Sequence, residues 1–177
     1  MNGFRLPACK CRSKAATVGS LFRSSLVADG CDGASLVALA DRLTSEGAVP
    51  RFVSTTLGAV QPSDGDAIEV DISLEAAPAV LYDALVLPDG SGAVTALRAD
   101  GRTLEFIKDQ YRHCKPILAM GASDALLTAC GIDPALPDGQ PDPGVFVATD
   151  ASTATDAFVA AIAKHRHFAR ETDPPRV

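Results

Sequence analysis

The chain lacks tryptophan, has only two tyrosines and contains no long apolar run. Its core volume must therefore come mainly from Ala, Val, Leu and Ile. No apolar stretch approaches the roughly 18 to 20 residues that cross a bilayer, so we expect no membrane partner. The basic N-terminal residues are followed by no uninterrupted apolar segment, which argues against a secretory signal peptide. The net charge of −6 disfavours binding to a phosphate backbone, so we expect no nucleic-acid partner.

The five cysteines are scattered and odd in number, which is typical of a reduced, cytoplasmic protein rather than of a disulfide framework. Cys9 and Cys11 form a lone Cys-x-Cys without the four ligands of a structural zinc site, so we expect no metal. Cys31 follows the first predicted strand and lies between Asp29 and Asp32. Negative neighbours raise the pKa of a thiol, so an inert Cys31 is favoured over a nucleophile.

The 177 residues, 47% of them hydrophobic and 21% charged, are sufficient for one packed domain. Segment 34–48 has its leucines three and four residues apart, which indicates a helix, and segment 58–73 alternates around Asp64-Gly65, which indicates a hairpin. The last predicted helix carries His165 and His167 in its final turns, where the helix dipole favours cations. The predicted strands lie within residues 21–30, 49–55, 81–88, 117–121 and 145–150, and the helices within 34–48, 91–99, 102–113, 123–131 and 152–168.

Strands that alternate with helices predict an α/β domain. Its central sheet is mostly parallel, is covered by helices on both faces and carries the hairpin as an extension. We assign this domain to residues 21–169. An irregular tail or linker remnant at 1–20 precedes it, and a polar tail at 170–177 follows it.

Ligands of such sheets bind beyond the carboxyl ends of the strands. The loops to consider are therefore Asp29 to Ala34, Pro88 to Ala93, and Met120 to Asp124. Ser123 begins the helix after the third loop and is interpreted as its N-cap.

The chain resembles the DJ-1/PfpI superfamily, within the class I glutamine-amidotransferase-like group, over residues 22–168. Within that superfamily it is most similar to the C-terminal domain of large-subunit haem catalases. The segments that carry the resemblance are VADGCDGASLVAL, GAVQPSDGDAIEVDISL, YDALVLPDG, KPILAMGASDALL and AIAKHRHFARET. The resemblance implies a flavodoxin-like three-layer sandwich.

Active members of the superfamily place a cysteine on a strained turn, a nearby acid, and backbone N–H groups that bind developing negative charge. The resemblance puts Met120 at the cysteine position, and a thioether cannot attack a substrate. The acid falls on Asp32 or Ser35, depending on the alignment of the first loop. The glycine of the oxyanion site falls on Asp89, whose carboxylate opposes the charge that such a site stabilises.

The resemblance therefore implies a non-catalytic accessory domain that serves assembly, stability or chaperone-like roles in a catalase that removes hydrogen peroxide. Its expected partner is a catalase core or a second copy, and the haem belongs to that core, so we expect no cofactor and no enzymatic activity in this chain alone. One alternative is a hydrolase or glyoxalase-like enzyme that uses Cys31 as a relocated nucleophile with Asp32 or Asp29. Another is a small-molecule binding module that uses the cleft above the sheet.

Overall fold

A parallel six-stranded sheet forms the centre of the computed structural model, which describes residues 22–149 and 151–170. The strand order is β5-β2-β1-β6-β7-β8, and every neighbouring pair is parallel. This order reverses direction between β1 and β6, as in flavodoxin-like folds. The strands are β1 (Phe22–Leu26), β2 (Val49–Ser54), β5 (Ile72–Ser73), β6 (Ala84–Leu87), β7 (Ile117–Met120) and β8 (Val145–Ala148). The predicted α/β class is confirmed, while the tail predicted at 1–20 lies outside the described residues.

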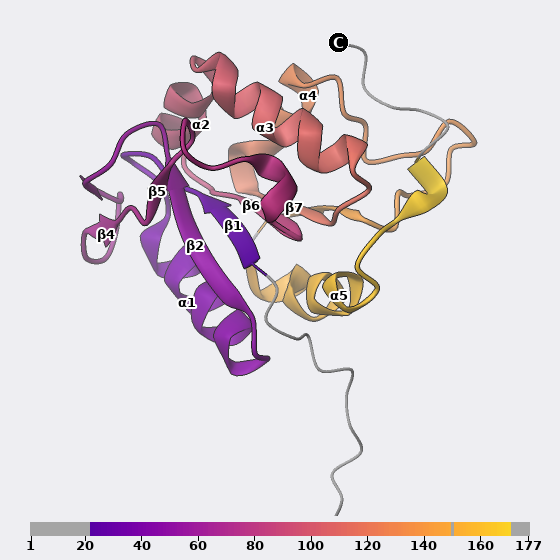
Figure 1. Cartoon of the computed structure of the whole chain (residues 1–177), viewed down its shortest axis with the longest axis horizontal. Helices are drawn as coiled ribbons and strands as arrows, with labels where there is room; N and C mark the ends of the chain where they lie inside the picture. Colours follow the sequence, from indigo (N-terminus) through magenta and orange to yellow (C-terminus); the bar gives the residue numbers. More distant parts are fainter. Residues whose placement is uncertain (1–21, 150, 171–177) are drawn as a thin grey trace, which may run out of the picture.

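Helices cover both faces of the sheet and complete three layers (Figure 1). One face carries α1 (Gly33–Ser45) and α5 (Ala151–Ala163), which contact each other. The other carries α2 (Ser91–Arg98), α3 (Gly101–Arg112) and α4 (Asp124–Ala129). Short 3-10 turns are η1 (Ala79–Leu81), η2 (Gly121–Ser123) and η3 (Phe168–Arg170). Within the described ranges, none of these helices has the length and apolar character to span a bilayer.

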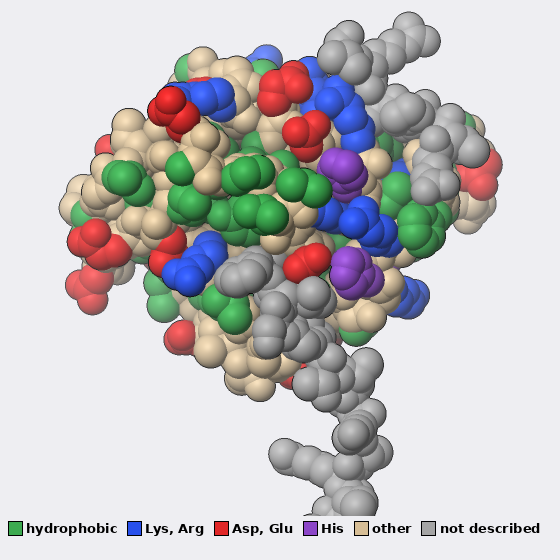
Figure 2. All heavy atoms as spheres, viewed as in Figure 1, with side chains coloured by type: hydrophobic (Ala, Val, Ile, Leu, Met, Phe, Trp, Pro, Cys, Tyr) green, Lys and Arg blue, Asp and Glu red, His purple; other side chains and the backbone are tan. Residues whose placement is uncertain are grey.

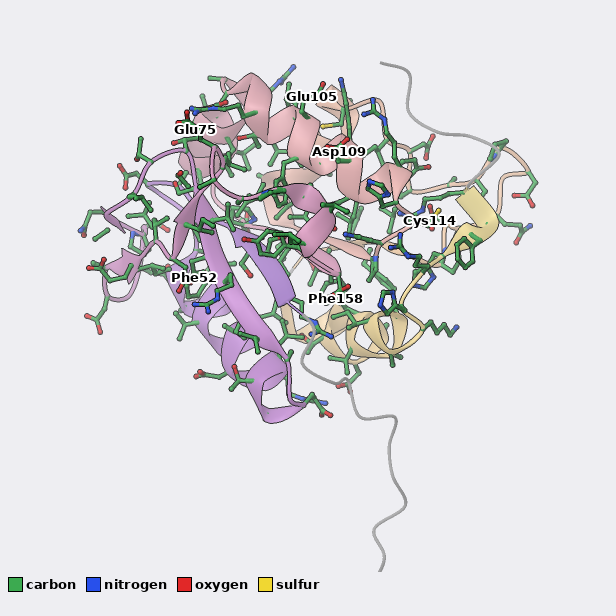
Figure 3. The ribbon with its side chains drawn as sticks, viewed as in Figure 1. Phe52, Glu75, Glu105, Asp109, Cys114 and Phe158 are labelled. Carbon is green, nitrogen blue, oxygen red and sulfur yellow. The ribbon has the colours of Figure 1, made fainter. Side chains whose placement is uncertain are left out.

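Aromatic and aliphatic side chains fill the space between the layers. Phe158 of α5 is fully buried against the sheet, and its ring meets Phe146 of β8 edge to face, with centroids 6.0 Å apart (Figure 3). On the other face, Tyr82 and Phe106 have ring centroids 5.7 Å apart. The edge-to-face pair adds to the free energy gained by apolar burial and helps to hold α5 on the sheet, while the tilted pair of Tyr82 and Phe106 buries apolar surface between α3 and the sheet.

Strand β1 is unusual because polar residues occupy the middle of the sheet. Arg23, Ser24 and Ser25 are all buried. The Ser24 hydroxyl donates to the carbonyl oxygen of Ala84 at 3.2 Å, which satisfies one of these groups. Burial lowers the pKa of Arg23 to about 10, and the charge of Asp83 partly opposes that shift. Two of the polar residues that interrupt the apolar pattern of this strand, Arg23 and Ser24, thus interact with the segment at Asp83 and Ala84.

The predicted hairpin is present but short. Its strands β3 (Ala59–Val60) and β4 (Ile68–Glu69) are antiparallel. The chain then leaves the hairpin, and β5 joins the main sheet beside β2. The Asp71 carboxylate fixes this change of direction, since it accepts the backbone N–H of Phe52 at 2.8 Å and pairs with Arg51 at 3.0 Å.

Helix α5 ends at Ala163, five residues before the predicted end at 168. His165 has a left-handed backbone, with φ of 69°, and cannot continue a helix. His167 is buried, and its Nε2 lies 3.1 Å from the carbonyl oxygen of Ala161. Burial lowers the pKa of His167. Both histidines lie beyond Ala163, so the prediction that they are cations in the last turns of the helix was wrong, although His167 does contact a carbonyl of the helix end.

The packed domain extends through Arg170 rather than ending at residue 169. Arg170 is buried, and its Nε and Nη2 each lie 2.8 Å from a carboxylate oxygen of the buried Asp142. Its Nη1 donates to the carbonyl oxygen of Lys115 at 2.9 Å, and its guanidinium lies 4.6 Å from the ring centroid of Tyr111. Residue 170, predicted as the start of a polar tail, is therefore part of the core.

Candidate functional site

Three loops meet at the carboxyl ends of the central strands, as the α/β pattern predicts. They are residues 29–34 after β1, residues 88–93 after β6 and residues 120–124 at the end of β7. The first two are joined by the backbone N–H of Asp32, which donates to the carbonyl oxygen of Asp89 at 3.0 Å. The last two are joined through the Asp89 side chain. This crevice is where the fold would present a catalytic group.

The carboxylate of Asp89 accepts hydrogen bonds from two backbone N–H groups of the crevice. Its Oδ1 accepts the N–H of Gly90 at 2.6 Å and the N–H of Ala122 at 2.9 Å. A Cβ on Gly121 would lie 2.1 Å from this carboxylate, so only glycine fits there. In a catalytic site, such N–H groups face the oxygen on which negative charge develops. Here they are already bonded to an internal anion.

The position predicted for the nucleophile holds no reactive group. Met120 is the buried last residue of β7, and its extended backbone, with φ of −102° and ψ of 135°, is unstrained. The nearest hydroxyl in this loop, that of Ser123, is buried and donates to the carbonyl oxygen of Pro88. Ser123 stands at the N-cap position of α4, yet its side chain caps no backbone N–H, so the N-cap interpretation holds for position only.

Cys31 lies in the first loop with no exposed surface. Burial raises the pKa of its thiol; backbone hydrogen bonds partly oppose that shift, and the smaller effects of the Asp32 and Asp64 charges add to it. A reactive thiol needs exposure and an electropositive setting. The structure therefore supports an inert Cys31 and argues against its use as a relocated nucleophile.

Asp29 and Asp32, the two acids considered as partners of Cys31, accept hydrogen bonds from backbone N–H groups. Asp32 is the N-cap of α1, and its carboxylate accepts the N–H of Ser35 at 2.9 Å and the Ser35 hydroxyl at 2.6 Å. Asp29 accepts the N–H of Gln61 at 2.8 Å, which ties the first loop to the hairpin. The two alternative positions for the superfamily acid, Asp32 and Ser35, are thus bonded to each other.

The two other thiols of the described residues, Cys114 and Cys130, are also buried, and burial raises the pKa of Cys130 to about 11. Cys9 and Cys11 lie outside the described residues. In the part of the chain that the structure describes, no group of three or more His, Cys, Asp or Glu side chains could hold a metal ion.

Comparison with known proteins agrees with this fold. A family described as the C-terminal domain found in long catalases matches residues 15–172. The chain belongs to this family. It is 34% identical over 146 residues to Catalase HPII of Pseudomonas putida, covering 82% of this chain and 19% of that protein. It is 38% identical over 146 residues to Catalase C of Rhizobium meliloti, covering 82% and 20%. The domain thus spans about a fifth of the length of these relatives.

A solved structure shows the same fold at low sequence identity. It is a two-domain protein from Anabaena variabilis with DJ-1/ThiJ/PfpI-like and ferritin-like domains. The TM-score is 0.69 at 14% identity, and the match covers 80% of this chain and 48% of that one. The predicted DJ-1/PfpI-like fold is therefore confirmed.

Sequence reasoning missed a buried cation of this catalase C-terminal domain. Lys115 precedes β7, and its ammonium donates to the carbonyl oxygens of Ala79 at 3.2 Å, Val80 at 2.9 Å and Tyr82. Burial lowers its pKa to about 8, with Asp83 opposing that shift. The only signal was a charged residue directly before an apolar strand. This lysine holds the η1 turn and lies at the amino-terminal ends of the strands, opposite the Asp89 crevice at their carboxyl ends.

Three surface hollows border the domain, and one of them reaches Ser91 and Ala122 of the crevice loops. A cavity of about 710 Å³ between α1 and the hairpin has an acidic rim that includes Asp41 and Glu69. A second, of about 490 Å³, lies between α2 and α4. A third, of about 410 Å³, lies beside η1. None of these three is lined by Met120, Asp89 or Cys31.

Proposed function

We propose that this domain is a non-catalytic accessory part of a large-subunit catalase and that it stabilises the assembled enzyme. The main support for the proposal is the Asp89 carboxylate, which accepts hydrogen bonds from the backbone N–H groups of the crevice. Peroxide chemistry and the haem belong, in this proposal, to the four fifths of a long catalase that this chain does not match.

The crevice chemistry supports the absence of covalent catalysis. Its strand end offers a thioether, Met120, and its nearest thiol, Cys31, is buried with a raised pKa. A developing oxyanion would meet the Asp89 carboxylate instead of free N–H donors, and two like charges at hydrogen-bond distance repel each other. The nucleophile of a superfamily hydrolase is thus replaced by Met120. The residues at the position of its acid, and its oxyanion N–H groups, are already hydrogen-bonded within the domain.

The packing of the domain supports a structural role. Its C-terminal segment is held by the buried pair of Arg170 and Asp142. Its core runs without interruption from α1 to α5 through the sheet. A rigid, well-packed body of this size can protect a neighbouring domain from local unfolding, because contacts made only in the folded state lower the population of open states.

The proposal is tested by grafting this chain onto Catalase HPII of Pseudomonas putida in place of the fifth that it matches. The grafted enzyme should retain peroxide turnover at high temperature longer than the enzyme cut at the same point. The isolated chain, supplied with hemin, should release no oxygen from hydrogen peroxide. Oxygen release by the isolated chain, or a graft that loses activity as fast as the truncated enzyme, would refute the proposal.

A further inference from the structure

Two large apolar side chains stand side by side on the surface of the domain. Val80 and Leu81 of η1 are 58% and 62% exposed. Leu81 lines the hollow of about 410 Å³ together with Tyr82, Ile72 and the charged pair Arg51–Asp71. We call Ile72, Val80 and Leu81 the η1 patch. Figure 2 shows hydrophobic side chains gathered on this part of the surface.

The η1 patch is held outward by buried donors. Lys115 donates to three carbonyl oxygens of residues 79–82, and the Gln110 side chain donates to that of Ala79. The N–H of Leu81 donates to Pro78 at 3.1 Å. The backbone of the turn is therefore bonded from inside, and Val80 and Leu81 cannot turn into the core. An exposed apolar group that is already fixed in place next to a hollow is typical of a docking surface, because little conformational entropy is lost on binding.

The η1 patch lies near the point where the chain enters the domain. Phe22, where the described domain begins, pairs with Val49, and Arg23 pairs with Ala84, two residues after Tyr82. Val80 and Leu81 thus lie shortly before the amino-terminal end of β6, beside the start of β1, where the chain enters the domain. In a long catalase the rest of the protein precedes its C-terminal domain, so it connects to this fold at the same end of the central strands.

We infer that the η1 patch docks onto the catalase core that precedes the domain in long catalases. This inference rests on the proposed accessory function. The core surface that fits is an apolar depression, which receives Val80 and Leu81 and faces the rim pairs Arg51–Asp71 and Asp83–His165. A free interface of moderate affinity buries about 800 Å² on each partner. A tethered partner has a high effective concentration, so a smaller contact suffices.

The test uses carbene footprinting, which labels exposed side chains, on the isolated chain and on the Pseudomonas putida graft. Labelling of Val80 and Leu81 should fall strongly in the graft, while labelling of Leu57, 68% exposed in the loop after β2, should be unchanged. Leu81→Asp should restore labelling of Val80 in the graft, because losing the burial of one leucine shifts a docking equilibrium by roughly tenfold. Leu57→Asp is the matched control and should change nothing.

The outcomes separate the docking surface from the function. Protection elsewhere on the domain, with Val80 and Leu81 still labelled, overturns this inference and leaves the accessory function standing. No protection anywhere, together with no gain in thermal resistance, overturns both. If the isolated chain sediments as a dimer in which Val80 and Leu81 are already protected, the occupant is a second copy and the inference is wrong. Both Asp variants place a charge at an exposed position, and an unchanged melting temperature of the isolated variants verifies that they fold.

Discussion

Removing the Asp89 carboxylate tests the central feature of the crevice. Asp89→Ala leaves the N–H groups of Gly90 and Ala122 without the oxygen that they contact at 2.6 and 2.9 Å. A hydrogen bond to a charged group contributes about 1.5 to 3 kcal/mol when buried, and less here because Asp89 is half-exposed. For the two bonds together we expect the free energy of unfolding to fall by about 1–3 kcal/mol. Asp89→Asn, which keeps an acceptor oxygen, should lose less.

The vacated N–H groups should then bind a small anion. We expect formate to raise the urea midpoint of Asp89→Ala, because a ligand that binds only the folded state stabilises it. The wild-type protein, whose donors are occupied, should not respond. Asp66→Ala, at an exposed acid of the hairpin loop, is the control for a general effect of charge. Equal stability of Asp89→Ala and wild type, or an equal response of both to formate, would contradict the internal-anion interpretation.

Three further predictions concern buried groups. Burial lowers the pKa of Lys115 to about 8 from 10.5, so between these pH values the unfolded chain binds more protons than the folded one. The free energy of unfolding should therefore rise with pH across that window. Urea titrations of Lys115→Met should lack this rise. Iodoacetamide should label native Cys31 more slowly than free cysteine, with mass spectrometry as the readout, and labelling at the free rate would contradict the raised pKa. Arg170→Met should lose about 3–5 kcal/mol in urea unfolding because it leaves the Asp142 carboxylate buried without its partner, whereas Arg102→Met, at an exposed pair that solvent screens, should lose far less.

The sequence was most informative where local pattern and burial agree. Strands β6 and β7 are continuous apolar runs, and both occupy the interior of the sheet as expected. Helix α1 begins at the predicted place because Asp32 caps it, an interaction within four residues of chain. The end of α5 was misplaced because the left-handed backbone at His165 and the buried ring of His167 depend on partners outside the helix.

What the sequence determined by itself is the chemistry available at the end of β7: the residue there is Met120, and no fold can give a thioether the reactivity of a thiolate. The alternation of predicted strands and predicted helices likewise specified an α/β domain with a mostly parallel sheet. Only the tertiary structure decided that the Asp89 carboxylate turns into the N–H groups of Gly90 and Ala122, and that Val80 stays on the surface. The physical reason is distance along the chain. Asp89 and Ala122 are 33 residues apart, and local periodicity carries no information about which distant donor a carboxylate will meet.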